Sequence, residues 1–153
     1  MAVLIGADEW DSLQETLFWL SRPGTLAAVA QARQELVDGR TIGEDEMRAE
    51  FNVPPSIVEV SSDDEKSDEV EFAGSARRDL QGVPPRIVPA IIEFVYGDLA
   101  RYPRRVGNPL QRELEGLWSA RRGPYRIIYD IVEERLVIIV VQVDRRADVY
   151  RPR

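Results

Sequence analysis

The chain has 153 residues, of which 44% are apolar, which is enough for one ordinary domain or for a small domain with an accessory segment. Its formal net charge of −7 hides a division: residues 1–70 hold 16 acidic and 5 basic side chains, whereas residues 71–153 hold 11 acidic side chains and 15 arginines. Because the chain has no cysteine and no histidine, disulfides, thiol nucleophiles and imidazole acid–base chemistry are excluded, and a zinc site is disfavoured.

Three helices are predicted in the acidic part of the chain. The first spans residues 8–20, with Asp8 as its capping residue and an apolar stripe at spacings of three and four. The second spans 23–37 and ends before Gly39. The third, 43–51, carries acidic residues in its first turn, where the helix dipole favours them. The stripe of the first helix consists of Trp10, Leu13, Leu17 and Leu20.

A linker is predicted at 56–68, because residues 61–68 read SSDDEKSD and contain no apolar side chain. A short strand at 57–60 precedes this polar run. The three consecutive carboxylates at 63–65 could hold a metal in principle, but a solvated linker explains them better. The chain therefore divides into a helical segment, 1–55, the acidic linker and a second unit, 69–153.

The second unit has the element order β-α-α-β-β-β. Alternating residues at 69–73 predict its first strand, and a turn at 133–134 joins its last two long strands into a hairpin. Pro89 marks a kink in its long helix or a later beginning of that helix. This order predicts an α+β fold, in which an antiparallel sheet carries helices on one face and the N-terminal helices pack on it. The expected strands are 69–73, 117–121, 125–132, 135–143 and a short edge at 147–150, and the expected helices are 75–81 and 84–101.

Arginines gather near the ends of the last strands. In a hairpin that turns at 133–134, Arg122 would lie opposite Arg145, and Tyr125 opposite Gln142. Guanidinium groups brought together in this way repel one another unless an anion lies among them, which favours a site for a phosphate backbone over a solvated rim. The tyrosines add rings that could stack on bases, although core packing is the simpler role for Tyr129.

Residues 114–131 (LEGLWSARRGPYRIIYDI) and 143–150 (VDRRADVY) resemble the RelE/YoeB toxins of bacterial toxin–antitoxin systems. Residues 70–80 (VEFAGSARRDL) resemble the first strand and helix of that family, so the resemblance covers about 69–153. RelE toxins cleave mRNA in the ribosomal A site with the 2′-OH of the RNA as nucleophile. The resemblance therefore implies an mRNA interferase, an endoribonuclease that inhibits translation, with mRNA and the ribosome as partners and no cofactor.

The resemblance also implies roles for single residues. Arg126 would stabilise charge on the scissile phosphate, Arg146 would position that phosphate or assist the leaving oxygen, and Tyr150 would stack on a base or transfer a proton. This chain departs from the family by having no histidine, by Asn108 near the position of a YoeB glutamate, and by residues 117–119 (LWS) in place of the RelE lysines. Arg121, Arg122 and Arg145 are the RNA-binding candidates that could substitute for those lysines.

The N-terminal part resembles a different family. Residues 9–37 resemble the C-terminal half of a YefM/Phd-type (RelB-like) antitoxin, and 41–51 resemble its acidic toxin-wrapping tail. Few residues precede 8–20, so the DNA-binding module of such antitoxins is expected to be missing or vestigial. The chain thus resembles a truncated antitoxin fused to its toxin. Trp10, Leu13, Leu17 and Leu20 would contact the toxin half and keep it silent.

Two alternatives stay open at this point. One is an interaction module that is catalytically degenerate or neutralised by its own helices. The other is the ParE branch of the superfamily, which inhibits gyrase and does not cut RNA. A second copy of the chain is a further candidate partner. A cytoplasmic protein without a membrane segment is expected, because the longest apolar run, 136–141, is far too short to span a bilayer.

Overall fold

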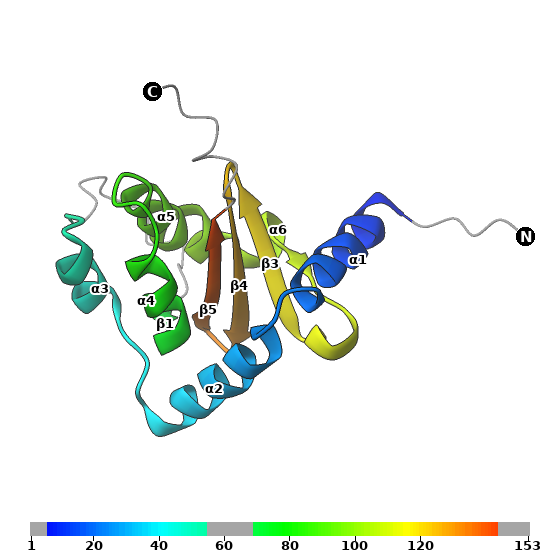
Figure 1. Cartoon of the computed structure of the whole chain (residues 1–153), viewed down its shortest axis with the longest axis horizontal. Coiled ribbons are helices and arrows are strands. Elements are labelled where there is room, and N and C mark those ends of the chain that lie inside the picture. The colour runs from blue at the N-terminus through cyan, green and yellow to red at the C-terminus, as the bar shows by residue number, and fades with distance from the viewer. Residues whose placement is uncertain (1–5, 55–68, 144–153) are drawn as a thin grey trace, which may run out of the picture.

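The structure, a computed structural model, describes residues 6–54 and 69–143 (Figure 1). None of its described helices is long and apolar enough to cross a membrane. The predicted linker at 56–68, the strands predicted at 57–60 and 147–150, and Arg145, Arg146 and Tyr150 lie outside the described residues.

A five-stranded sheet forms the centre of the fold, with strand order β1-β5-β4-β3-β2. Three of its pairings are antiparallel, whereas β1 runs parallel to β5, so the sheet is mixed. The parallel pairing arises because helices separate β1 from the later strands, and a crossover of this length can return the chain in the same direction. The α+β fold class is confirmed. The strands are β1 (Glu69–Phe72), β2 (Asn108–Pro109), β3 (Leu117–Arg122), β4 (Tyr125–Val132) and β5 (Arg135–Val143).

The β4–β5 hairpin turns where the sequence predicts, but its register changes along its length. Val132 pairs with Arg135 beside the turn, in the expected register. A bulge between Ile128 and Tyr129 then shifts the pairing by one residue. The prediction that Tyr125 lies opposite Gln142 is therefore wrong, because Tyr125 pairs with Val143.

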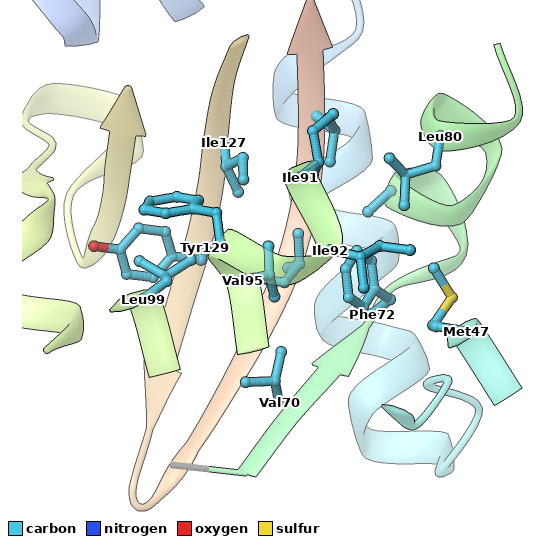
Figure 2. Close-up of a cluster of buried hydrophobic side chains, with 14 of the residues drawn as sticks. Met47, Val70, Phe72, Leu80, Ile91, Ile92, Val95, Leu99, Ile127 and Tyr129 are labelled. Atoms are coloured by element: carbon cyan, nitrogen blue, oxygen red, sulfur yellow. The ribbon is translucent and has the colours of Figure 1, made fainter. Parts of the chain in front are cut away.

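One face of the sheet carries the larger hydrophobic core, shown in Figure 2. The side chains of Phe72, Ile127 and Tyr129 point from the strands into this core, where they meet Ile91 and Val95 of the α5 region. Met47 of the N-terminal segment also lies in it and has no exposed surface. The helices of this unit are α4 (Gly74–Gln81), α5 (Val88–Phe94), a π-helix (Val95–Leu99), α6 (Pro103–Val106) and a 3₁₀ turn (Arg112–Leu114).

A second hydrophobic cluster joins the opposite face of the sheet to the N-terminal helices. Trp19, Val29 and Ala32 of these helices are buried against Ile128 and Val137 of the sheet. Figure 1 shows this segment running round the sheet, from beside β3 to the far side of α4. Residues far apart in the sequence therefore share one core. The helices of the segment are α1 (Ala7–Leu20), α2 (Thr25–Asp38) and α3 (Glu44–Phe51).

Two helix predictions need correction. Helix α1 begins at Ala7 with Gly6 as its N-cap, so Asp8 lies inside the helix and does not cap it. The helix predicted at 84–101 begins at Val88, close to Pro89, and then widens into the π-helix. A proline fits only the first turn of a helix, where its missing N–H is not needed, and this explains the later beginning.

Candidate active site and its cover

Arg121 and Arg126 are direct partners across β3 and β4. Like charges placed directly opposite each other on two strands are unfavourable unless an anion compensates them. Side chains alternate between the two faces of a strand, so Arg121 shares a face with Ser119, and Arg126 shares a face with the buried Ile128. These four side chains belong to the face that α1 and α2 cover.

Arg122 belongs to the opposite face. Its guanidinium lies 4.4 Å from the centre of the Phe94 ring and 3.1 Å from the carboxylate of Asp98. It pairs with Tyr125, whose buried hydroxyl has its pKa raised by desolvation, an effect that Arg122 partly offsets. The structure thus brings Arg121 and Arg126 together and separates Arg122 from them, although all three lie at the same end of the sheet.

Helix α1 contacts the sheet through a polar stripe. Ser12 donates a hydrogen bond to the Pro109 carbonyl, and the Thr16 hydroxyl accepts one of 2.9 Å from the Gln111 amide. Trp19, one turn further on, has no exposed surface. Polar groups can be buried in this way because each has a partner.

The predicted apolar stripe lies on another side of α1. Trp10 and Leu17 keep 48% and 49% of their surface exposed, so they are not part of the buried face of α1, which Ser12, Thr16 and Trp19 form. Leu13 is half-buried, and Leu20 is half-buried and packs against the second core. Positions 12, 16 and 19 lie on one face of a helix, whereas 10, 13 and 17 are rotated well away from it.

Glu15 connects α1 to the paired arginines. One oxygen of its carboxylate accepts a hydrogen bond of 2.8 Å from the Ser119 hydroxyl. The other accepts one of 3.2 Å from Nε of Arg126. The Glu15 and Arg126 side chains are only 13% and 21% exposed, so this ion pair is shielded from solvent far more than a surface pair.

An aromatic ring covers the same arginine. The Arg126 guanidinium lies 3.9 Å from the centre of the Phe18 ring, and Arg22 approaches that ring at 5.4 Å. Phe18 in turn packs edge-on against Trp19. Arg126 is therefore held by a carboxylate on one side and by an aromatic face on another, both supplied by α1.

The contacts of the N-terminal segment continue along the sheet. Glu35 of α2 is buried and accepts a hydrogen bond of 2.8 Å from the amide of Gly74, at the beginning of α4. Ile42 then exchanges two backbone hydrogen bonds of 2.8 Å with Phe72, which adds a bridge to the outer edge of β1. Both contacts satisfy backbone groups that the second unit would otherwise leave unpaired.

Helix α3 is fixed by a buried arginine. Arg48 bonds Glu44 of its own helix at 2.7 Å and Glu93 of α5 at 3.0 Å. Desolvation is the largest influence on its pKa and would lower it, but the two carboxylates more than offset this and leave the pKa raised. The guanidinium also lies over the ring of Tyr96. Arg48 thus stays charged and joins α3 to α5.

The tyrosine in the middle of β4 has a structural role, as predicted. Tyr129 has no exposed surface, and its hydroxyl donates to the Pro103 carbonyl. Burial raises its pKa above the ordinary range, so the phenol stays protonated at neutral pH. The backbone of Gly107 passes so close that a β-carbon there would meet this hydroxyl.

The sequence alone missed three members of this site. Ser119 is a buried polar residue in the apolar first part of β3, and this was an available signal. Nothing in the sequence marked Glu15 or Phe18 as partners of Arg126. Within 6–54 and 69–143, no three or more acidic residues gather closely enough to suggest a metal site.

The second unit matches a known family over most of its length. Residues 70–150 match the model described as the ParE toxin of type II toxin–antitoxin systems, parDE. Toxin RelG of Mycobacterium tuberculosis is 55% identical over 82 residues, which are 54% of this chain and 94% of RelG. Toxin RelE of the same organism is 44% identical over 82 residues, which are 84% of that protein.

The remaining part of the chain has a relative of its own. Antitoxin RelF of Mycobacterium tuberculosis is 62% identical over 53 residues, which cover 35% of this chain and 57% of RelF. A crystal structure of the toxin–antitoxin complex RelBE2 from the same organism is also similar. The match has a TM-score of 0.50 and 50% sequence identity, and it covers 51% of this chain and 99% of the matched chain.

Proposed function

The chain belongs to the ParE toxin family of type II toxin–antitoxin systems, and from this premise we propose that residues 69–153 are a RelE-type mRNA endonuclease held inactive by the N-terminal helices. The chain combines a RelE-like toxin with an antitoxin-like segment. One observation carries the proposal: Glu15 and Phe18 of the antitoxin-like segment both contact Arg126 of the toxin half.

The proposed chemistry uses the 2′-OH of the RNA as the nucleophile. Its attack on the neighbouring phosphorus forms a 2′,3′-cyclic phosphate and breaks the bond to the 5′-oxygen of the next nucleotide, which leaves as a hydroxyl after taking up the proton that the 2′-OH gives up. The phosphate oxygens carry extra negative charge during this exchange, and fixed positive groups stabilise that charge. Arg126 supplies this stabilisation, with Arg121 beside it as a second cation. Arg146 and Tyr150, which lie outside the described residues, keep their proposed roles in holding the phosphate and in stacking or proton transfer.

The proposed inhibition is competition for the same surface. While α1 is docked, the carboxylate of Glu15 neutralises Arg126, and the Phe18 ring occupies the space above its guanidinium. Because the segment belongs to the same chain, its effective concentration is on the order of mM, far above that of a separate antitoxin at low abundance. RNA then gains access only when α1 leaves the sheet.

The test compares the full chain with residues 69–153 alone. We expect residues 69–153 to arrest translation and to create new mRNA 5′ ends within codons at the ribosomal A site, and the full chain to do so much less. In residues 69–153, Arg126→Ala should abolish cleavage, whereas Arg104→Ala, at an exposed arginine of α6, should not. Cleavage that survives Arg126→Ala would contradict the proposed site.

The other outcomes separate the alternatives. Because the matching family model is that of the parDE toxins, inhibition of gyrase is the second candidate. Arrested supercoiling without A-site cleavage would establish that branch. Normal growth with soluble, folded residues 69–153 would favour a degenerate module whose remaining role is to bind an antitoxin.

A further inference from the structure

We propose that Ser119 and Arg126 form a two-donor site for one phosphodiester of the RNA, which makes Ser119 a substrate-binding residue. The inference rests on the proposed function and goes beyond it, because RelE toxins have lysines in the segment that reads 117–119 here, and the resemblance gives a serine in that segment no role. Glu15 is then the internal occupant of the phosphate position.

The hydrogen bonds at Glu15 define the site. Ser119 and Arg126 donate to different oxygens of one carboxylate, at 2.8 and 3.2 Å. A phosphodiester also offers two anionic oxygens on one central atom, so the same pair of donors can hold it. Charge-assisted bonds of this kind are stronger than bonds between neutral groups.

The proton of Ser119 has a defined direction. The indole N–H of Trp19 donates to the Ser119 oxygen at 3.0 Å, and an indole can only donate. The single hydroxyl proton of Ser119 must therefore point to Glu15. Trp19 and Glu15 thus keep the serine oriented as an anion donor while α1 covers it.

The backbone positions of the two donors do not depend on α1. Ser119 pairs with Ile128 across β3 and β4, and Arg126 is two residues from Ile128 on the same face. Both side chains stand on central strands of the sheet, with Arg121 adjacent. Departure of α1 would leave both donors side by side on the sheet and open to an anion.

While α1 is docked, the Ser119 hydroxyl finds its hydrogen-bond partners on that helix. Ser119 is 1% exposed and lies between Leu117 and Arg121 on the face of β3 that α1 covers. Burying a hydroxyl costs free energy unless it is hydrogen-bonded, and both of its bonds go to α1. When α1 is absent, the Ser119 hydroxyl needs another hydrogen-bond acceptor in the place of the Glu15 carboxylate.

The experiment opens the site in the full chain and uses inorganic phosphate as the probe. Glu15→Ala removes the internal carboxylate, while Trp19 and Ser12 still hold α1. We expect phosphate to raise the melting temperature of Glu15→Ala and to shift the NMR signal of the Arg126 Nε–H group. The parent chain and Glu9→Ala, which removes an exposed acid from the same helix, should respond little.

Ser119 is then tested in the opened chain. Glu15→Ala with Ser119→Ala should bind phosphate about tenfold more weakly, because one bond to a charged oxygen is lost. Glu15→Ala with Ser119→Thr, which keeps the hydroxyl, should recover most of that affinity. Amide exchange in α1, measured on each variant, identifies any chain in which the helix has detached.

The outcomes are distinguishable from those of the proposed function. Phosphate that leaves the Arg126 signal unchanged in Glu15→Ala would overturn the site, even if residues 69–153 cleave mRNA. Equal phosphate affinity with and without the Ser119 hydroxyl would show that Ser119 only anchors Trp19. Phosphate binding that depends on Ser119, with no cleavage of mRNA, would keep the anion site and overturn the endonuclease.

Discussion

Trp19→Ala should release α1 from the sheet, whereas Trp10→Ala on the same helix should not. A tryptophan buries about 150–250 Å², and at about 25 cal/mol per Å² this area is equivalent to roughly 4–6 kcal/mol. Trp19 has no exposed surface and also bonds Ser119, so we expect its replacement to cost about 3–5 kcal/mol. Trp10 is 48% exposed, and its replacement should cost about 1 kcal/mol or less.

Amide hydrogen exchange of the folded chain measures this difference element by element. In Trp19→Ala, the amides of α1 should exchange on the order of a hundredfold faster or more, because each 1.4 kcal/mol is about tenfold in the opening equilibrium. Amides in the centre of β4 should change much less. Equal effects of the two substitutions, or unchanged exchange of α1 in Trp19→Ala, would refute the assignment of the contact face.

Three further predictions concern the scaffold. Gly107→Ala should destabilise the fold by about 1–3 kcal/mol, since its methyl would meet the Tyr129 hydroxyl; Gly97→Ala, with open space at its β-carbon, should be neutral in thermal melts. Burial raises the pKa of Asp79, so the folded chain holds this proton more tightly than the unfolded chain. Stability should therefore fall as pH rises from about 4 towards the raised pKa, and Asp79→Asn should flatten that part of a urea-midpoint profile. Glu35→Ala should cost about 1–2 kcal/mol in denaturant melts by leaving the first turn of α4 uncapped; an unchanged midpoint would contradict the capping role.

The strands were the part of the fold that the sequence predicted best. Residues 125–132 and 135–143 match β4 and β5, because apolar residues and a short turn define a hairpin locally. The bulge beside Tyr129 was not predictable, since one extra residue within the apolar run 136–141 of β5 breaks no visible pattern. The parallel pairing of β1 depends on a long-range contact that local periodicity does not report.

The sequence predicted the strand residues of the candidate site, but it did not predict which residues of α1 cover them. Arg126 was identified through its resemblance to a family motif, and the structure places it next to Arg121. The contact face of α1 was misassigned because hydrophobic periodicity selects Trp10 and Leu17, whereas the buried face is built from hydrogen-bonded polar groups and Trp19. Such a face has no periodic apolar signature, so only its partners across the interface reveal it.

The division of charge between the two halves does not by itself explain how the N-terminal segment docks on the sheet; the positions of individual salt bridges explain more. Glu15 with Arg126 follows the expected pattern of an acidic cover on a basic surface. Arg33 with Asp130 and Arg48 with Glu93 reverse it, with the cation on the N-terminal side. A uniform acidic cover would leave those carboxylates facing like charge. The docked arrangement is therefore selected by local complementarity. Under the proposed function, the net charge of each half would act mainly on encounter with nucleic acid once α1 has left the sheet.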